Sequence, residues 1–174
     1  MKLTSEKITL RKFNEQDATR LALLCNNIKI WNNVRDYLPH PYSEKDGLAF
    51  IRAVAEEDPL ATFAIDYEDE LAGCIGIQPQ SDVYRLTAEI GFWIGEPFWG
   101  KGIAPEAIKL ATNYGFEELG LIRMYAHCFD FNIGSQKALT KAGFHREGVA
   151  EKAIIKNDRI GDEIRFALIR KSQD

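Results

Sequence analysis

The sequence predicts a single α/β domain of the α+β kind over residues 1–174, with a central mixed, mostly antiparallel sheet of about seven strands flanked by about four helices. Three observations predict it. Stretches with apolar side chains at every second residue alternate with stretches at helical spacing. One strand runs through a glycine-rich turn into a helix and then into another strand, which favours a parallel crossover. The 174 residues, 45% of them hydrophobic, can bury a substantial core.

Turn and capping residues indicate where the expected elements begin and end. Asn14, Ser43 and Asn132 are suitable N-caps, and Asp46 stands three positions after Ser43, as in a capping box. Gly120 follows the helix that the glycine-rich turn opens. The expected elements are, in order, a strand at 7–13, helices at 15–27, 28–36 and 43–57, strands at 62–67, 71–78 and 87–94, a helix at 105–119, a strand at 123–129, a helix at 132–141, and strands at 144–155 and 159–169.

The expected strand at 87–94 has two different faces. Alternation places four apolar side chains on one face, which we expect to lie in the core. The other face carries a carboxylate beside a missing side chain, which leaves open space next to a group capable of acid–base chemistry. The core-facing residues are Ala88, Ile90, Phe92 and Ile94, and the opposite face carries Glu89, Gly91 and Trp93.

The turn after this strand predicts an anion-binding site. Gly95, Gly100 and Gly102 permit a tight turn with exposed amides, and Pro105 suits the first turn of the next helix. Unpaired amides at the positive end of a helix dipole bind anions. The stretch from Gly95 to Lys101 nearly satisfies the P-loop pattern G-x-x-x-x-G-K-[ST], but Gly102 replaces the residue that would bind magnesium. A dinucleotide fingerprint would need a third glycine at Pro105. We expect a metal-free pyrophosphate cradle, with nucleotide hydrolysis as an alternative.

Two stretches, EIGFWIGEPFWGKGIAPEA and FNIGSQKALTKAGF, resemble the GNAT acetyltransferases, in particular the RimJ/RimL-like branch of ribosomal-protein N-terminal acetyltransferases. ITLRKFNEQDATRL and LPHPYSEKDGLAFI also resemble this branch. The resemblance implies the GNAT acyl-CoA N-acyltransferase fold and acetyl-CoA as co-substrate. The family motif [RQ]-x-x-G-x-[GA], whose amides hold the pyrophosphate, falls on Trp99 to Ala104, with Trp99 in place of the usual Arg or Gln. The residues implied to bind the cofactor are Phe92, Trp93, Ile94, Trp99, Gly100, Lys101, Gly102, Ile103, Ala104, Asn132 and Ser135.

Glu89 is the candidate catalytic base. Acetyl transfer requires the amine to lose a proton, whereas a thiol is already a fair leaving group. Glu89 shares its strand face with Gly91, where the missing side chain leaves room for an acyl thioester. Its resemblance to the strand glutamate of several GNAT enzymes supports this role. The alternative is a solvated carboxylate, or a structural ion pair with an arginine such as Arg85.

Asn132 and Ser135 form an N-x-x-S pattern at the start of a helix. By residue type alone they are helix-capping residues. The resemblance implies that Asn132 binds the pantetheine arm or a bridging water, and that Ser135, as a second catalytic residue, donates a hydrogen bond to the departing sulfur. It also implies an oxyanion donor among the backbone N–H groups near Ile94, if the strands that begin at Thr87 and Arg123 splay apart.

Histidines and cysteines suggest no metal and no covalent intermediate. Tyr125 and His127 share a strand face and could line the acceptor side, or pack in the core or on the surface. The histidines lack metal-ligand spacing, and the widely spaced cysteines are expected to be reduced core thiols. Transfer is therefore expected to be direct, in a ternary complex. These residues are His40, His127 and His145, and Cys25, Cys74 and Cys128.

We expect an acetyl-CoA-dependent N-acetyltransferase whose acceptor, by branch resemblance, is a protein or peptide N-terminal amine. The alternatives are a small amine such as an amino acid, polyamine or aminoglycoside-like compound, and a non-catalytic acyl-CoA sensor. The net charge of −4 argues against nucleic acid, and the 11 acidic against 3 basic residues from Glu44 to Glu89 suit a cationic acceptor. Without a long apolar stretch or a signal peptide, a cytoplasmic monomer or homodimer with no membrane partner is expected.

Overall fold

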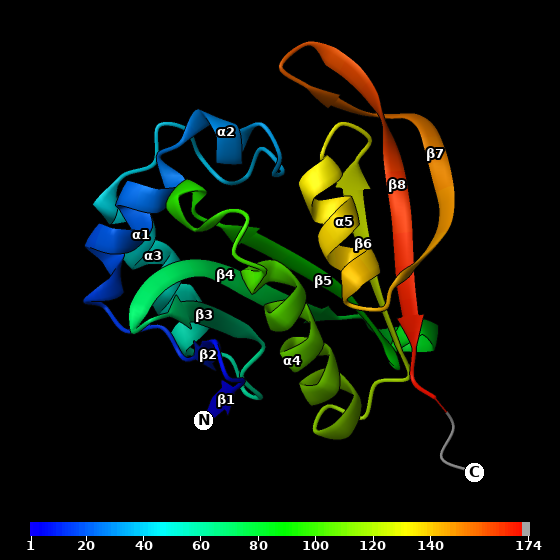
Figure 1. The fold of residues 1–174 in the computed structure, drawn as a ribbon, viewed down its shortest axis with the longest axis horizontal. Coiled ribbons are helices and arrows are strands. Elements are labelled where there is room, and N and C mark those ends of the chain that lie inside the picture. The colour runs from blue at the N-terminus through cyan, green and yellow to red at the C-terminus, as the bar shows by residue number, and fades with distance from the viewer. Residues whose placement is uncertain (172–174) are drawn as a thin grey trace.

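The computed structural model describes residues 1–171, which form one eight-stranded sheet with five α-helices and two short 3₁₀-helices (Figure 1). No helix in this range is long and apolar enough to cross a membrane. Along the chain the elements are β1 (Lys2–Thr4), β2 (Ile8–Arg11), α1 (Asp17–Cys25), α2 (Ile28–Trp31), α3 (Glu44–Ala55), β3 (Thr62–Tyr67), β4 (Glu70–Pro79), η1 (Asp82–Tyr84), β5 (Thr87–Ile94), η2 (Glu96–Phe98), α4 (Ile103–Glu117), β6 (Arg123–Phe129), α5 (Ile133–Lys141), β7 (His145–Lys156) and β8 (Arg159–Ile169).

The sheet has the order β1-β2-β3-β4-β5-β6-β8-β7. Every neighbouring pair is antiparallel except β5 and β6, which are parallel and joined through α4. The predicted fold class is confirmed. The sheet has one strand more than expected because β1, only three residues long, is too short for alternation to reveal; it is defined by pairing with β2.

The parallel strands β5 and β6 separate soon after they begin. Only Thr87, Ala88 and Glu89 pair with β6. Beyond Glu89, β5 continues to Ile94 while paired to β4, and β6 continues to Phe129 while paired to β8. The expected splay is therefore present, and it opens a gap in the sheet directly after Glu89.

Helices pack on both faces of the sheet. On one face, α1 packs against α3 and against β4. On the other face, α4 crosses β2, β4, β5 and β6, and Gly115 in α4 lies so close to Met124 that an added Cβ would meet the sulfur at 2.8 Å. The largest fully buried side chains come from both layers and include Leu21, Ile51, Ile75 and Ile108. In Figure 1, α4 and α5 lie together on the near side of the sheet.

Some element boundaries differ from those expected. Helix α2 ends at Trp31 rather than near residue 36, and residues 32–40 are irregular. Asn14 does not cap α1: the N-cap is Gln16, and the Asp17 carboxylate instead accepts from the Asn14 N–H. The capping box of Ser43 and Asp46 is confirmed.

Candidate active site

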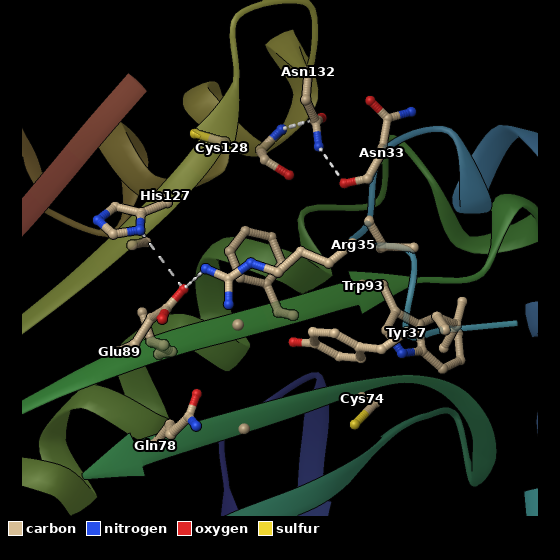
Figure 2. A pocket seen from close by; sticks show the side chains of 18 of the residues that line it. Asn33, Arg35, Tyr37, Cys74, Gln78, Glu89, Trp93, His127, Cys128 and Asn132 are labelled. Atoms are coloured by element: carbon tan, nitrogen blue, oxygen red, sulfur yellow. Dashed lines mark hydrogen bonds and ion pairs between the residues drawn. The ribbon is translucent and has the colours of Figure 1, made fainter. Parts of the chain in front are cut away.

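A cavity of about 710 Å³ lies where β5 and β6 diverge (Figure 2). Strands β4, β5 and β6 supply its floor. The segment after α2, the start of α5 and the end of the β7–β8 hairpin supply its walls. Residues with polar or charged side chains gather around it from all these elements. These polar and charged residues include Arg35, Gln78, Glu89, His127, Asn132, Ser135 and Glu163.

Glu89 occupies the last position at which β5 pairs with β6. Its neighbour on the same face, Gly91, has nothing within 4 Å of the place where a Cβ would stand. The strand alternation therefore places a carboxylate next to open space, as predicted. The carboxylate is largely buried, with 17% of its side chain exposed. Across the antiparallel pair, Gln78 of β4 lies opposite Glu89.

Arg35 is the ion-pair partner of Glu89. Its Nη2 donates to Glu89 Oε1, and His127 Nδ1 lies 3.9 Å from the same oxygen. The expected alternative partner, Arg85, instead donates to the carbonyl of Asp82. Burial lowers the pKa of the Arg35 guanidinium, but the charges and hydrogen bonds of Glu89 and Tyr37 more than offset this and raise it, so Arg35 stays cationic.

The turn before α4 has the geometry of an anion cradle. Gly100 and Gly102 have φ of +78° and +79°, a conformation that favours glycine, and a Cβ on either would meet nothing within 4 Å. Gly102 is the N-cap of α4 and provides no side-chain cap. The N–H groups from Gly100 to Ala104 find no acceptor among residues 1–171. Five neighbouring amides at a helix N-terminus are thus left without an acceptor in this part of the chain, and this fits a pyrophosphate.

Two side chains of the cradle are engaged elsewhere. The indole Nε1 of Trp99 donates to the Ile94 carbonyl at 2.7 Å, which ties the turn back to the end of β5. Lys101 Nζ lies over the rings of Tyr67 and Phe98, at 5.0 and 5.3 Å from their centroids. Trp99 therefore shapes the turn, and the cradle offers backbone donors first.

Asn132 begins α5 beside the cavity. Its Oδ1 accepts from the Ser135 N–H at 3.2 Å, which confirms the predicted cap. Its Nδ2 also donates to the Asn33 carbonyl at 3.4 Å, so the capping residue holds the chain segment that carries Arg35. The side chains of both Asn132 and Ser135 line the cavity.

Residues 32–36, which we call the strap, are tied to the β7–β8 hairpin on the far side of the cavity. Lys156 Nζ lies 2.6 Å from Asp36 Oδ1 and 3.6 Å from the centroid of the Trp31 ring. Asn157 Nδ2 donates to Asn32 Oδ1 at 2.6 Å. The Lys156 side chain is only 3% exposed. No motif in the sequence pointed to Arg35 or Lys156, because both act on residues more than fifty positions away.

The three cysteines are free and buried, as expected. Cys74 and Cys128 line the cavity wall. Burial raises the pKa of Cys25 and of Cys128 to about 12, and raises that of Cys74 as well. These thiols are protonated near neutral pH and are poor nucleophiles. Among residues 1–171 there is also no group of three histidine, cysteine or acidic side chains suited to a metal ion.

Two of the three histidines, His40 and His145, lie away from the cavity. His40 stacks on Trp31 with ring centroids 5.5 Å apart, and His145 is 3.9 Å from Glu147. His127, by contrast, lines the cavity next to Tyr125, with ring centroids 5.2 Å apart. The sequence allowed Tyr125 and His127 either an acceptor-side or a packing position, and the structure places His127 in the lining of the cavity.

A family model described as Acetyltransferase (GNAT) domain matches residues 7–145. The chain belongs to the GNAT acetyltransferase family. It is an acetyl-CoA-dependent N-acetyltransferase, as the sequence motifs predict.

Several relatives of this GNAT chain match over nearly their whole length. An uncharacterized N-acetyltransferase of Bacillus subtilis, YoaA, is 30% identical, with 97% of this chain and 96% of YoaA covered. The [Ribosomal protein uS5]-alanine N-acetyltransferase of Escherichia coli is 27% identical, with 97% and 90% covered. The structure of the microcin C7 self-immunity acetyltransferase MccE, in complex with acetyl-CoA and AMP, is 26% identical with a TM-score of 0.81, and 95% and 94% are covered. The expected ribosomal-protein branch is represented among these relatives.

Proposed function

We propose that this GNAT enzyme acetylates the N-terminal amine of a protein or peptide by direct transfer from acetyl-CoA. The observation that carries the site assignment is the position of Glu89: a buried carboxylate at the point where β5 leaves β6, facing a 710 Å³ cavity. The relative that acts on a ribosomal-protein alanine supports the acceptor class.

The amides from Gly100 to Ala104 are assigned to the pyrophosphate of acetyl-CoA. About three charge-assisted hydrogen bonds at roughly 1.5–3 kcal/mol each would supply several kcal/mol of binding. The remaining cofactor contacts are proposed along the open edge of β5, and at Asn132 and Ser135. Phe92, Trp93 and Ile94 are assigned to this second part of the cofactor site, and Trp99 shapes the turn beside them through its hydrogen bond to the Ile94 carbonyl.

In the proposed reaction, acetyl-CoA supplies an acetyl thioester whose carbonyl lies in the gap between β5 and β6. A backbone N–H near Ile94 stabilises the negative charge that develops on the carbonyl oxygen. Glu89 takes a proton from the amine, because an N-terminal ammonium with a pKa of about 7.7–8.0 must lose one to become nucleophilic. Ser135 donates a hydrogen bond to the departing sulfur. The high pKa values of the buried thiols support transfer without an acetyl-cysteine.

A small amine is the second candidate acceptor. The strap and the hairpin meet across the cavity through Asp36 and Lys156, and such a cover suits an acceptor that enters with a narrow end. A peptide N-terminus and a linear polyamine both have this shape.

Thiol release from acetyl-CoA, with acetylated product identified by mass spectrometry, tests the proposal. The acceptor panel contains a peptide with a free alanine N-terminus, the same peptide with a blocked N-terminus and one internal lysine, spermidine, and free amino acids. We expect turnover of the free N-terminus and not of the blocked peptide. Turnover confined to spermidine or amino acids would overturn the acceptor class. Tight acetyl-CoA binding without turnover of any amine would favour the sensor alternative.

A further inference from the structure

His127 is a titratable group in the acceptor cavity that the reaction above does not use. Its Nδ1 lies 3.9 Å from Glu89 Oε1 and 3.6 Å from Glu163 Oε2, while 25% of its side chain is exposed. Glu163 comes from β8, and its other oxygen accepts from Arg165 Nε at 2.9 Å. The imidazole therefore lies between the proposed base, Glu89, and a second carboxylate, Glu163, which Arg165 orients.

The proton balance of the reaction requires a way out of the cavity. Once the ammonium has given one proton to Glu89, the lone pair of the neutral nitrogen forms a bond to the acetyl carbon, and the carbon–sulfur bond then breaks. To end as an amide, the nitrogen loses two protons. One finishes on the sulfur of coenzyme A, and the other goes to solvent. Glu89 holds the proton that goes to solvent, and it must pass this proton on before the next turnover.

Other groups near Glu89 are unsuited to carry this proton. Arg35 stays cationic, and Lys156 is held by Asp36 and the Trp31 ring. Burial, followed by the charge of Glu89, raises the pKa of the Tyr125 phenol. Imidazole, in contrast, is the side chain that both gains and loses a proton near neutral pH.

We propose that His127 is a proton relay that takes the amine-derived proton from Glu89 and releases it to solvent, with Glu163 as a positioning residue for the imidazolium. This proposal rests on the proposed role of Glu89. In the relay step one solvent water bridges the 3.9 Å between Glu89 Oε1 and His127 Nδ1. Through it the Glu89 carboxylic acid gives its proton to Nδ1 of the neutral ring, and the imidazolium then gives a proton to water or buffer. The charged groups that face the ring are Glu89 and its partner Arg35 from the β5 side, and Glu163 with its partner Arg165 from the β8 side.

The test is the steady-state rate of peptide acetylation by His127→Gln in weakly buffered solution, with increasing amounts of added imidazole. We expect kcat to fall about tenfold, less than the effect of losing a primary acid or base, with the KM for acetyl-CoA unchanged. Added imidazole should restore kcat because it replaces the missing proton carrier. Glu163→Gln should lower kcat in the same direction by a smaller factor. His145→Gln, at a histidine outside the cavity, should match wild type at every imidazole concentration.

If wild type is active, two outcomes would overturn the relay and leave the proposed function standing. The first is a kcat for His127→Gln equal to that of wild type. The second is a lower kcat that imidazole does not restore, in a His127→Gln variant whose circular dichroism spectrum matches that of wild type. If His127→Gln does not fold, the kcat of Glu163→Gln is the deciding measurement. A kcat below that of wild type that imidazole restores supports the relay, and an unchanged kcat overturns it. If wild type turns over no amine in the panel, the proposed function fails and the relay fails with it.

Discussion

Arg35 and Glu89 form an ion pair across 54 positions of sequence, at the mouth of the gap between β5 and β6. The guanidinium binds Oε1 of the carboxylate, on a side chain that is 17% exposed. The proposed base is thus neither free in solvent nor paired within its own hairpin. It is oriented by the strap, which Asn132 and Lys156 hold in turn.

Glu89→Gln is expected to lower kcat about 100-fold at neutral pH, in the range typical of a lost general base. The defect should shrink as pH rises above about 8, because the N-terminal amine then loses its proton without help. Initial rates of peptide acetylation between pH 6 and 9 measure this. Glu147→Gln is the control, since Glu147 is also paired to an arginine, Arg123, but lies outside the cavity. A wild-type rate for Glu89→Gln across this range would rule out its role as base.

Gly102→Ala is expected to weaken acetyl-CoA binding by about tenfold or more, corresponding to the loss of roughly one charge-assisted amide hydrogen bond. Gly102 has φ +79°, and the added methyl group would occupy the open space next to the cradle amides. Gly120→Ala is the matched control, because Gly120 has φ +66° and open space around it but lies beyond the far end of α4. Both variants should lose a similar free energy of unfolding, about 1–2 kcal/mol. Isothermal titration calorimetry measures the change in acetyl-CoA affinity, and urea unfolding measures the change in stability. Equal acetyl-CoA affinities of Gly102→Ala and Gly120→Ala would contradict the cradle assignment.

Lys156→Gln is expected to lower the free energy of unfolding by about 1–2 kcal/mol, because it removes a desolvated ammonium from the face of Trp31. It should also raise the KM for the acceptor more than that for acetyl-CoA, since the contact with Asp36 anchors the strap. Lys152→Gln, at an exposed position of the same strand, serves for comparison. Equal free energies of unfolding for the two variants would show that the contacts of Lys156 with Asp36 and Trp31 do not stabilise the fold.

The buried thiol of Cys25 is expected to make stability fall at high pH. Burial raises its pKa to about 12 in the folded chain, above the value of 9.0 for a free thiol. Between these two values the unfolded state has lost a proton that the folded state still holds, so the free energy of unfolding decreases as pH rises. One such group contributes up to about 1.4 kcal/mol per pH unit. Urea unfolding at pH 8 to 10.5 should give a shallower decline for Cys25→Ala than for wild type; identical slopes would contradict the prediction.

Local conformation could be predicted because neighbouring residues determine it. The cap at Asn132, the capping box at Ser43 and the left-handed Gly102 each depend on contacts or backbone angles within a few positions. The sequence alone therefore predicted the starts of α3 and α5 and the tight glycine-rich turn before α4. The alternation along β5 likewise placed Glu89 opposite the core face. The cap predicted at Asn14 was wrong because the Asp17 carboxylate competes for the same first turn.

Long-range pairing was decided only by the tertiary structure. The distance at which β5 leaves β6, the choice of Arg35 over Arg85 as partner of Glu89, and the meeting of His127 with Glu163 depend on strand register and on where an irregular segment after α2 crosses the sheet. A charged side chain in a sequence carries no mark of which distant partner it will meet, because that choice follows from the packing of the whole chain. The sequence alone therefore determined the local geometry of the proposed donor site, and the tertiary structure decided which charged groups surround the proposed acceptor position.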